Sequence, residues 1–133
     1  MNENEVLVPV ASEIDVVIAR QQGRELAARL GFSKTNLALI ATAISEIARN
    51  IVEYADKGEM TIRVIREGGR SGVMVVARDR GPGIPDIAKA LEDGFSTGRG
   101  LGLGLPGARR LMDEFHIESK VGKGTTVTMK KWL

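Results

Sequence analysis

Residues 33–54 read SKTNLALIATAISEIARNIVEY, and they carry the strongest structural signal in the chain. Apolar residues recur here every three or four positions, which is the spacing of one face of an α-helix. Ser33 is a residue type that caps helix N-termini, so the helix is predicted to begin after it and to run to about Tyr54. A stripe this continuous predicts that the helix packs lengthwise against a sheet. The apolar face comprises Leu37, Ile40, Ala41, Ile44, Ile47, Ala48 and Ile51.

Weaker patterns lie before this helix. A short strand is predicted at residues 6–10. A further helix is predicted over residues 12–30, and Gly31 should end it, because glycine readily adopts the left-handed conformation of a helix stop. The side chains expected on its buried face are Ile14, Val17, Ile18, Leu26 and Leu30.

The second half of the chain predicts two hairpins. Residues 60–66 and 73–77 have strand patterns, and the glycine-rich turn at 68–72 joins them. Residues 116–120 and 125–132 form the second pair, around a turn that contains two more glycines. At the end of that pair, Lys130 and Lys131 are interpreted as a solvent-exposed strand end.

Between the hairpins, residues 86–92 predict a short helix and residues 93–103 show no periodicity. Pro106 suits the first turn of a helix, which is predicted to continue to about Phe115. This order of elements predicts an α+β fold: a two-layer sandwich in which helices cover one face of a mixed, mostly antiparallel sheet.

Composition narrows the classes of function. The 133 residues include no cysteine, which excludes a disulfide scaffold, and the length predicts a single domain over 1–133. A net charge of +2 and 4% aromatic residues argue against nucleic-acid binding. The apolar run at 73–77 is too short to cross a bilayer, and the polar residues 1–5 do not resemble a secretory signal. We therefore expect a cytoplasmic protein with no membrane contact.

The long helix carries a first chemical motif. Glu46 and Asn50 are one turn apart, so their side chains can converge. A carboxylate and an amide oxygen at this spacing suit a hard cation such as Mg²⁺, and the carboxylate could also take a proton from a hydroxyl group. An ordinary exposed polar face is the alternative.

A second motif, Asp79-Arg80-Gly81-Pro82-Gly83, follows a predicted buried strand. The aspartate could accept a hydrogen bond from an exocyclic amine, and Gly81 and Gly83 would let the backbone approach a flat ring. A plain turn is the alternative, because these are common turn residues.

A third motif alternates glycine with leucine before the helix at Pro106, at Gly100, Gly102 and Gly104. Backbone N–H groups at a helix N-terminus can hold phosphate groups. A dinucleotide-binding fold is excluded because no apolar strand precedes these glycines. A flexible surface loop remains the alternative.

Together the three motifs supply what an ATP site requires: a metal ligand with a base, an acceptor for adenine, and a phosphate cradle. In this order they resemble the GHKL, or Bergerat, ATP-binding superfamily of gyrase, Hsp90, histidine kinases and MutL. Within it, Ser45-Glu46-Ile47-Ala48-Arg49-Asn50 and residues 92–97 and 105–115 are similar to the bacterial anti-sigma-factor-like serine kinases, above all the stressosome switch kinases.

The resemblance implies roles for individual residues. Glu46 would be the catalytic base, and Asn50 would bind Mg²⁺. Asp79 would bind adenine, Thr125 (or its neighbour Thr126) would assist it, and residues 93–101 would form a lid over the nucleotide. The nucleotide-binding residues implied in this way are Asn50, Asp79, Gly81, Gly83, Gly100, Gly102, Gly104 and Thr125.

The resemblance also implies a function. The chain would be an ATP-dependent serine/threonine kinase of a partner-switching stress system, which phosphorylates STAS-domain proteins and then activates a PP2C-type phosphatase. The alternative is an anti-sigma factor that sequesters a sigma factor and phosphorylates its anti-anti-sigma antagonist. A plain ATPase is a third possibility. Arg99 or Arg49 could meet the γ-phosphate.

Overall fold

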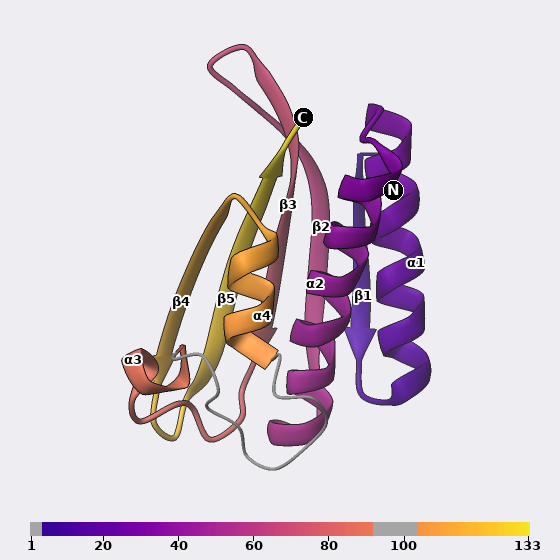
Figure 1. Cartoon of the computed structure of the whole chain (residues 1–133). Coiled ribbons are helices and arrows are strands. Elements are labelled where there is room, and N and C mark those ends of the chain that lie inside the picture. The colour runs from indigo at the N-terminus through magenta and orange to yellow at the C-terminus, as the bar shows by residue number, and fades with distance from the viewer. Residues whose placement is uncertain (1–3, 92–103) are drawn as a thin grey trace.

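A computed structural model describes residues 4–91 and 104–133. Its sheet has five strands in the order β1-β2-β3-β5-β4, and the helices α1, α2 and α4 lie on one face of it (Figure 1). This confirms the α+β sandwich, although every strand pairing in the described ranges is antiparallel. The elements are β1 Glu5–Val10, α1 Glu13–Leu30, α2 Lys34–Tyr54, β2 Gly58–Glu67, β3 Arg70–Asp79, α3 Ile87–Ala90, α4 Gly104–Leu111, β4 Glu114–Lys120 and β5 Gly124–Trp132.

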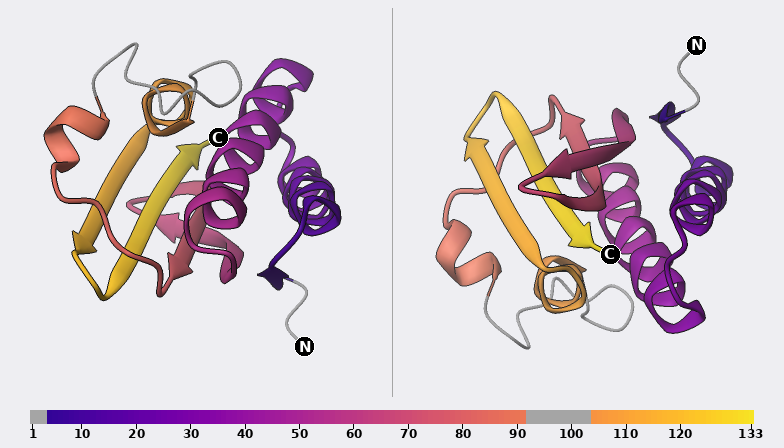
Figure 2. Two further views of the ribbon diagram at one scale, coloured as in Figure 1. Left: turned by 90° about the horizontal axis from the view of Figure 1, so that it is seen from below. Right: turned by 90° about the horizontal axis from the view of Figure 1, so that it is seen from above.

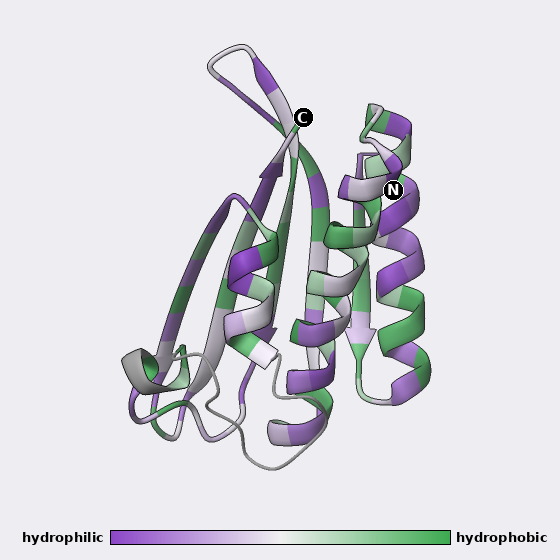
Figure 3. Cartoon of the chain, in the orientation of Figure 1, coloured by the Kyte–Doolittle hydropathy of each residue, from purple (hydrophilic) through white to green (hydrophobic). Residues whose placement is uncertain are grey.

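The central helix α2 forms as its sequence predicts. The Ser33 hydroxyl accepts a hydrogen bond from the Asn36 backbone N–H at 3.1 Å, which satisfies one of the free donors of the first turn. Every residue of the predicted apolar stripe is buried, and Ile40, Ile44 and Ile47 are among the largest fully enclosed side chains. Figure 3 shows hydrophobic and hydrophilic residues alternating along the helices, as expected for helices with one buried face.

The predicted face of α1 is wrong in the N-terminal half of the helix, whereas Leu26 is buried as predicted and Leu30 packs against the core. Ile14 is 70% exposed, and Val17 and Ile18 are also exposed. The buried residues are Leu26 together with Val16, Ala19, Gly23 and Ala27, which the sequence pattern does not predict. A Cβ atom at Gly23 would overlap Ile44 of α2, so small residues let the two helices approach closely. Ile14, Val17 and Ile18 are left on the outside.

Two boundaries also differ from the predictions. Strands β2 and β3 extend as far as the Gly68-Gly69 turn, where both glycines have positive φ, so the hairpin is longer than the apolar runs alone indicate. Helix α4 ends at Leu111, and Phe115 lies in β4 rather than in the helix. The Asp113 backbone N–H donates to the Lys130 carbonyl oxygen at 2.9 Å, so sheet pairing ends the helix early.

The helices α1, α2 and α4 form one layer, in which α4 is the neighbour of α2. Seen end-on in Figure 2, α4 and α2 lie side by side on the same face of the sheet, and α1 lies beyond α2. Among residues 4–91 and 104–133, no helix is long and apolar enough to span a bilayer.

Candidate functional site

The last turns of α2 are where the predicted motifs meet. Glu46 and Asn50 are both partly exposed on this helix. Gly104, the first residue of α4, lies against Asn50: a Cβ atom at Gly104 would be 3.9 Å from the Asn50 Oδ1 atom and 4.0 Å from its Nδ2 atom. Gly104 therefore places the end of the glycine motif next to Asn50 of the Glu46–Asn50 motif.

Glu46 has a defined local environment. Its Oε1 atom accepts a hydrogen bond from the Arg49 Nη1 group at 3.2 Å, and 17% of its side chain is exposed. Arg49 also lies 3.8 Å from the Glu13 carboxylate at the start of α1. Glu46 is thus accessible from solvent and held in place on one side.

Asp79 ends β3 opposite Thr125 of β5. One carboxylate oxygen, Oδ1, accepts the Gly81 backbone N–H at 2.8 Å and the Thr125 backbone N–H at 3.3 Å. Hydrogen bonds to an ionised acceptor are stronger than those between neutral groups, so the backbone fixes the orientation of this carboxylate. Both hydrogen bonds of the Asp79 carboxylate with the described residues use Oδ1, so within residues 4–91 and 104–133 Oδ2 is the oxygen left for a ligand.

The glycines that follow Asp79 are required by packing within the protein. A Cβ atom at Gly81 would lie 2.6 Å from the Ala55 Cβ atom at the end of α2. Gly83 has a φ of +79°, and a Cβ atom there would overlap the Lys120 carbonyl oxygen. The loop therefore fits between α2 and the β4–β5 turn, and it holds Asp79 beside the helix that carries Asn50.

Ser119 is a member of this region that sequence reasoning missed. Its hydroxyl oxygen accepts the Ile84 backbone N–H at 2.7 Å, and its O–H donates to the Gly124 carbonyl oxygen at 3.1 Å. It also lies 2.8 Å from the Thr125 hydroxyl oxygen. A single serine in a strand does not identify itself as a site residue in the sequence. Its role here depends on hydrogen bonds to two loops that are distant in sequence.

The structure places the described motif residues in two groups along α2: Gly104 beside Asn50, one turn from Glu46, and Asp79 with Gly81 and Thr125 in a loop that packs on Ala55 at the end of the helix, with Gly83 against Lys120. Thr125 is the threonine bonded to Asp79, so it is favoured over Thr126 as the residue beside that carboxylate. Gly100 and Gly102, Arg99 and the predicted lid at 93–101 lie outside the described residues.

Comparisons with known proteins bear on this arrangement. Residues 9–131 match the family model described as a histidine kinase-like ATPase domain. The chain is 53% identical over 126 residues to the serine/threonine-protein kinase RsbT of Bacillus subtilis, covering 95% of each chain. It is 36% identical over 121 residues to an anti-sigma F factor of Thermoanaerobacter sp., covering 86% of this chain and 83% of the other.

A solved structure supports the fold alone. The mycobacterial sensor histidine kinase MprB superposes with a TM-score of 0.59 at 16% identity, covering 96% of this chain and 97% of that one. The family match spans nearly the whole chain, and the sequence relatives extend almost end to end. The resemblance inferred from the motifs is confirmed: the chain belongs to the family of histidine kinase-like ATPase domains.

Proposed function

We propose that this protein is an ATP-dependent serine/threonine kinase of a partner-switching system, with one nucleotide-binding domain over residues 1–133. The observation that carries the proposal is that α2 has Gly104 beside its Asn50 and, at its end, the loop of the backbone-held Asp79 packed on Ala55 through Gly81. The 53% identity to a serine/threonine-protein kinase supports this class of activity.

Adenine would bind at Asp79. The Oδ2 oxygen would accept a hydrogen bond from the exocyclic amine, while Oδ1 keeps its contacts with Gly81 and Thr125. The phosphate groups would lie toward the N-terminus of α4, because exposed N–H groups and the helix dipole favour anions there. Gly104 provides that end, and Gly100 and Gly102 are proposed to contribute further N–H groups.

Mg²⁺ fits the Asn50 end of the site. The Asn50 amide offers a hard oxygen ligand, and the absence of a side chain at Gly104 leaves space next to it. Magnesium usually keeps several waters and binds substrate phosphates, so a single protein ligand suits it. When bound, the ion would neutralise charge on the phosphate oxygens.

Glu46 would act as the base. Its carboxylate would take the proton from a serine or threonine hydroxyl of the bound protein substrate. The hydroxyl oxygen would bond to the γ-phosphorus, the bond from that phosphorus to the β–γ bridging oxygen would break, and ADP would leave. Arg49, which binds Glu46 Oε1 at 3.2 Å, leaves Oε2 for this role.

The proposed partners follow from the family resemblance of the sequence motifs. We propose that STAS-domain proteins are the substrates and that a PP2C-type phosphatase is subsequently activated, in the cytoplasm. The identity to an anti-sigma F factor supports the second candidate, which sequesters a sigma factor and phosphorylates its anti-anti-sigma antagonist.

A radiolabel transfer experiment tests the proposal. The protein, γ-labelled ATP and magnesium are incubated with candidate STAS domains, and label is followed into protein and into free phosphate. Labelled STAS protein supports the kinase, release of free phosphate alone indicates an ATPase, and a tight complex with neither product indicates a binding module.

The substitution Glu46→Ala tests the proposed role of Glu46 as the base. It should retain nucleotide binding but lose about a hundredfold to ten-thousandfold in transfer rate, as expected for the loss of a general base. Glu53→Ala removes an exposed carboxylate two turns further along α2 and is the control. Equal loss of binding and transfer in Glu46→Ala would assign Glu46 a structural role instead.

A further inference from the structure

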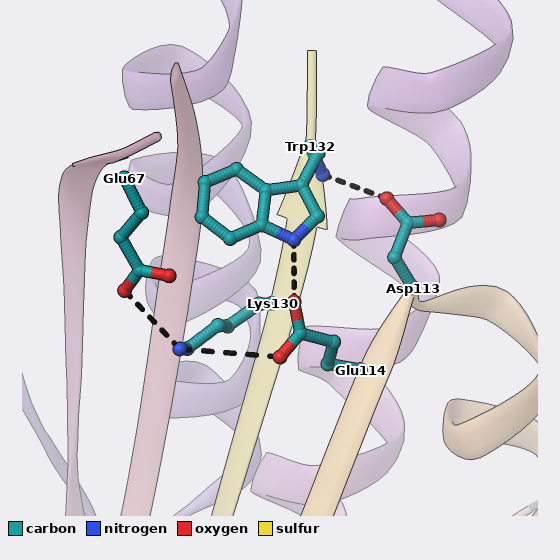
Figure 4. Close-up of polar contacts among 5 residues, drawn as sticks. All are labelled: Glu67, Asp113, Glu114, Lys130 and Trp132. Carbon is teal, nitrogen blue, oxygen red and sulfur yellow. Dashed lines mark hydrogen bonds and ion pairs between the residues drawn. The ribbon is translucent and has the colours of Figure 1, made fainter. Parts of the chain in front are cut away.

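The end of β5 holds the C-terminal end of α4. The Lys131 ammonium donates to the Leu111 carbonyl oxygen, the last of the helix, at 3.0 Å, and lies 3.5 Å from the Asp113 Oδ1 atom. The Asp113 Oδ2 atom accepts the Trp132 backbone N–H at 2.7 Å, a contact drawn in Figure 4. We call these contacts of Lys131 and Asp113 the α4 clamp.

Lys131 is not the solvent-exposed residue that the sequence predicts. Only 12% of its side chain is exposed. It pairs in register with the fully buried Val73, so it lies on the sheet face that the helices cover. A lysine enclosed in this way requires partners for its charge, and a cation at a helix C-terminus also complements the helix dipole. The charge and the position of Lys131 both indicate that it stabilises the end of α4.

Lys130 provides a natural contrast. It lies on the opposite face of the same strand, where its ammonium is 3.3 Å from a Glu67 carboxylate oxygen and 4.0 Å from one of Glu114 (Figure 4). The Trp132 indole N–H donates to the same Glu114 side chain. Two adjacent lysines therefore have similar kinds of partner, but only the ammonium of Lys131 binds α4.

The clamp bears on the nucleotide site because α4 is short. Eight residues rise about 12 Å, and a helix of this length is not stable alone in water. Its N-terminal residue Gly104 lies against Asn50, and its C-terminal residue Leu111 is held by Lys131. Because α4 has little more than two turns and depends on its contacts, we expect that release of its C-terminal end also shifts its N-terminal end.

We propose that Lys131 is a positioning residue for the nucleotide site, one that acts through α4. By holding the C-terminal end of the helix, it keeps Gly104 and the neighbouring N–H groups at the distance from Asn50 that magnesium and the phosphates require. The inference rests on the proposed nucleotide site. It means that Lys131, which contacts the opposite end of α4, contributes to the affinity for MgATP.

The test compares Lys131→Met with Lys130→Met. Binding of a non-hydrolysable ATP analogue with magnesium is measured by calorimetry, and transfer kinetics are measured on the substrate from the radiolabel experiment. We expect Lys131→Met to weaken the affinity about threefold to tenfold, as befits the loss of one charge-assisted hydrogen bond. The KM for ATP should rise by a similar factor with little change in kcat, and Lys131→Arg should restore the affinity.

Lys130→Met controls for loss of a lysine and of strand stability, and it should bind the analogue like the wild type. Equal affinities of wild type and Lys131→Met, or equal weakening by both substitutions, would overturn the inference. If Lys131→Met does not fold, Asp113→Asn removes the charge that faces Lys131 but keeps an acceptor for Trp132, and a smaller weakening is expected. A wild-type protein that does not bind the analogue would refute the proposed function, and the inference with it.

Discussion

Gly124 offers a quantitative test of how β5 is held against the site. Its φ is +119°, and a Cβ atom there would overlap the Asp79 carbonyl oxygen and lie 2.8 Å from the Arg80 Cα atom. Gly122, two residues earlier, also has a positive φ, +80°, but apart from its own chain neighbours no described residue has an atom within 4 Å of the position of its Cβ. Substituting alanine at each position therefore separates backbone strain from the close contact.

The expected cost differs between the two positions. A non-glycine residue in the left-handed region costs about 1–2 kcal/mol, and this applies to both substitutions. Gly124→Ala adds an overpacking cost of about 1–3 kcal/mol, since the obstacle is backbone rather than a movable side chain. We expect about 1 kcal/mol of destabilisation for Gly122→Ala and about 3 kcal/mol for Gly124→Ala. At about 3–5 °C per kcal/mol for a chain of this size, the variants should melt about 4 °C and about 12 °C below the wild type.

Thermal unfolding followed by circular dichroism measures both variants, and urea unfolding provides the free energies. Gly124→Ala should also weaken nucleotide binding, because relief of the overlap displaces Asp79, whereas Gly122→Ala should not. Identical melting temperatures for the two variants would refute the reasoning, since they would show that the contact with the Asp79 carbonyl exerts no constraint.

Two further substitutions test the site directly. Asp79→Asn retains an oxygen that can accept the Gly81 and Thr125 N–H groups, so thermal stability should stay near that of the wild type. Its new amide donor would face the adenine amine, and calorimetry should show affinity reduced about tenfold or more; unchanged affinity would exclude Asp79 from the adenine site. In wild type, magnesium should increase the affinity for the ATP analogue, and Asn50→Ala should abolish most of that increase. A magnesium titration that is the same for the variant and the wild type would show that Asn50 does not bind the ion.

Much of the fold follows from local sequence patterns. The α2 stripe and the Ser33 cap predict the central helix because periodicity and capping depend on neighbouring residues. The hairpins and the break at Gly31 are similarly local, and Gly31 does adopt a left-handed conformation, with φ +100°. The three motifs and their order were sufficient to identify the family.

Local patterns failed where the partner surface matters. The buried face of α1 uses Ala19 and Gly23, which carry little hydrophobic signal, because their small size permits close packing on Ile44. The exposed Ile14 and Val17 gave a stronger but misleading pattern. Hydrophobicity measures the tendency of a residue to be buried, but the shape of the opposing element selects which face is buried.

The amino-acid sequence alone thus predicts where the helices and turns form and which residues are candidates for the site, since these depend on near neighbours and on residue chemistry. The three-dimensional arrangement adds what depends on distant partners: Gly104 beside Asn50, the backbone N–H groups that orient Asp79, and the contact of Lys131 with the end of α4. The two lysines at 130 and 131 illustrate the difference. They are identical in type and adjacent in sequence, but successive side chains of a β-strand point to opposite faces of the sheet. Lys130 therefore lies on the face away from α4, and Lys131 lies on the face that α4 covers.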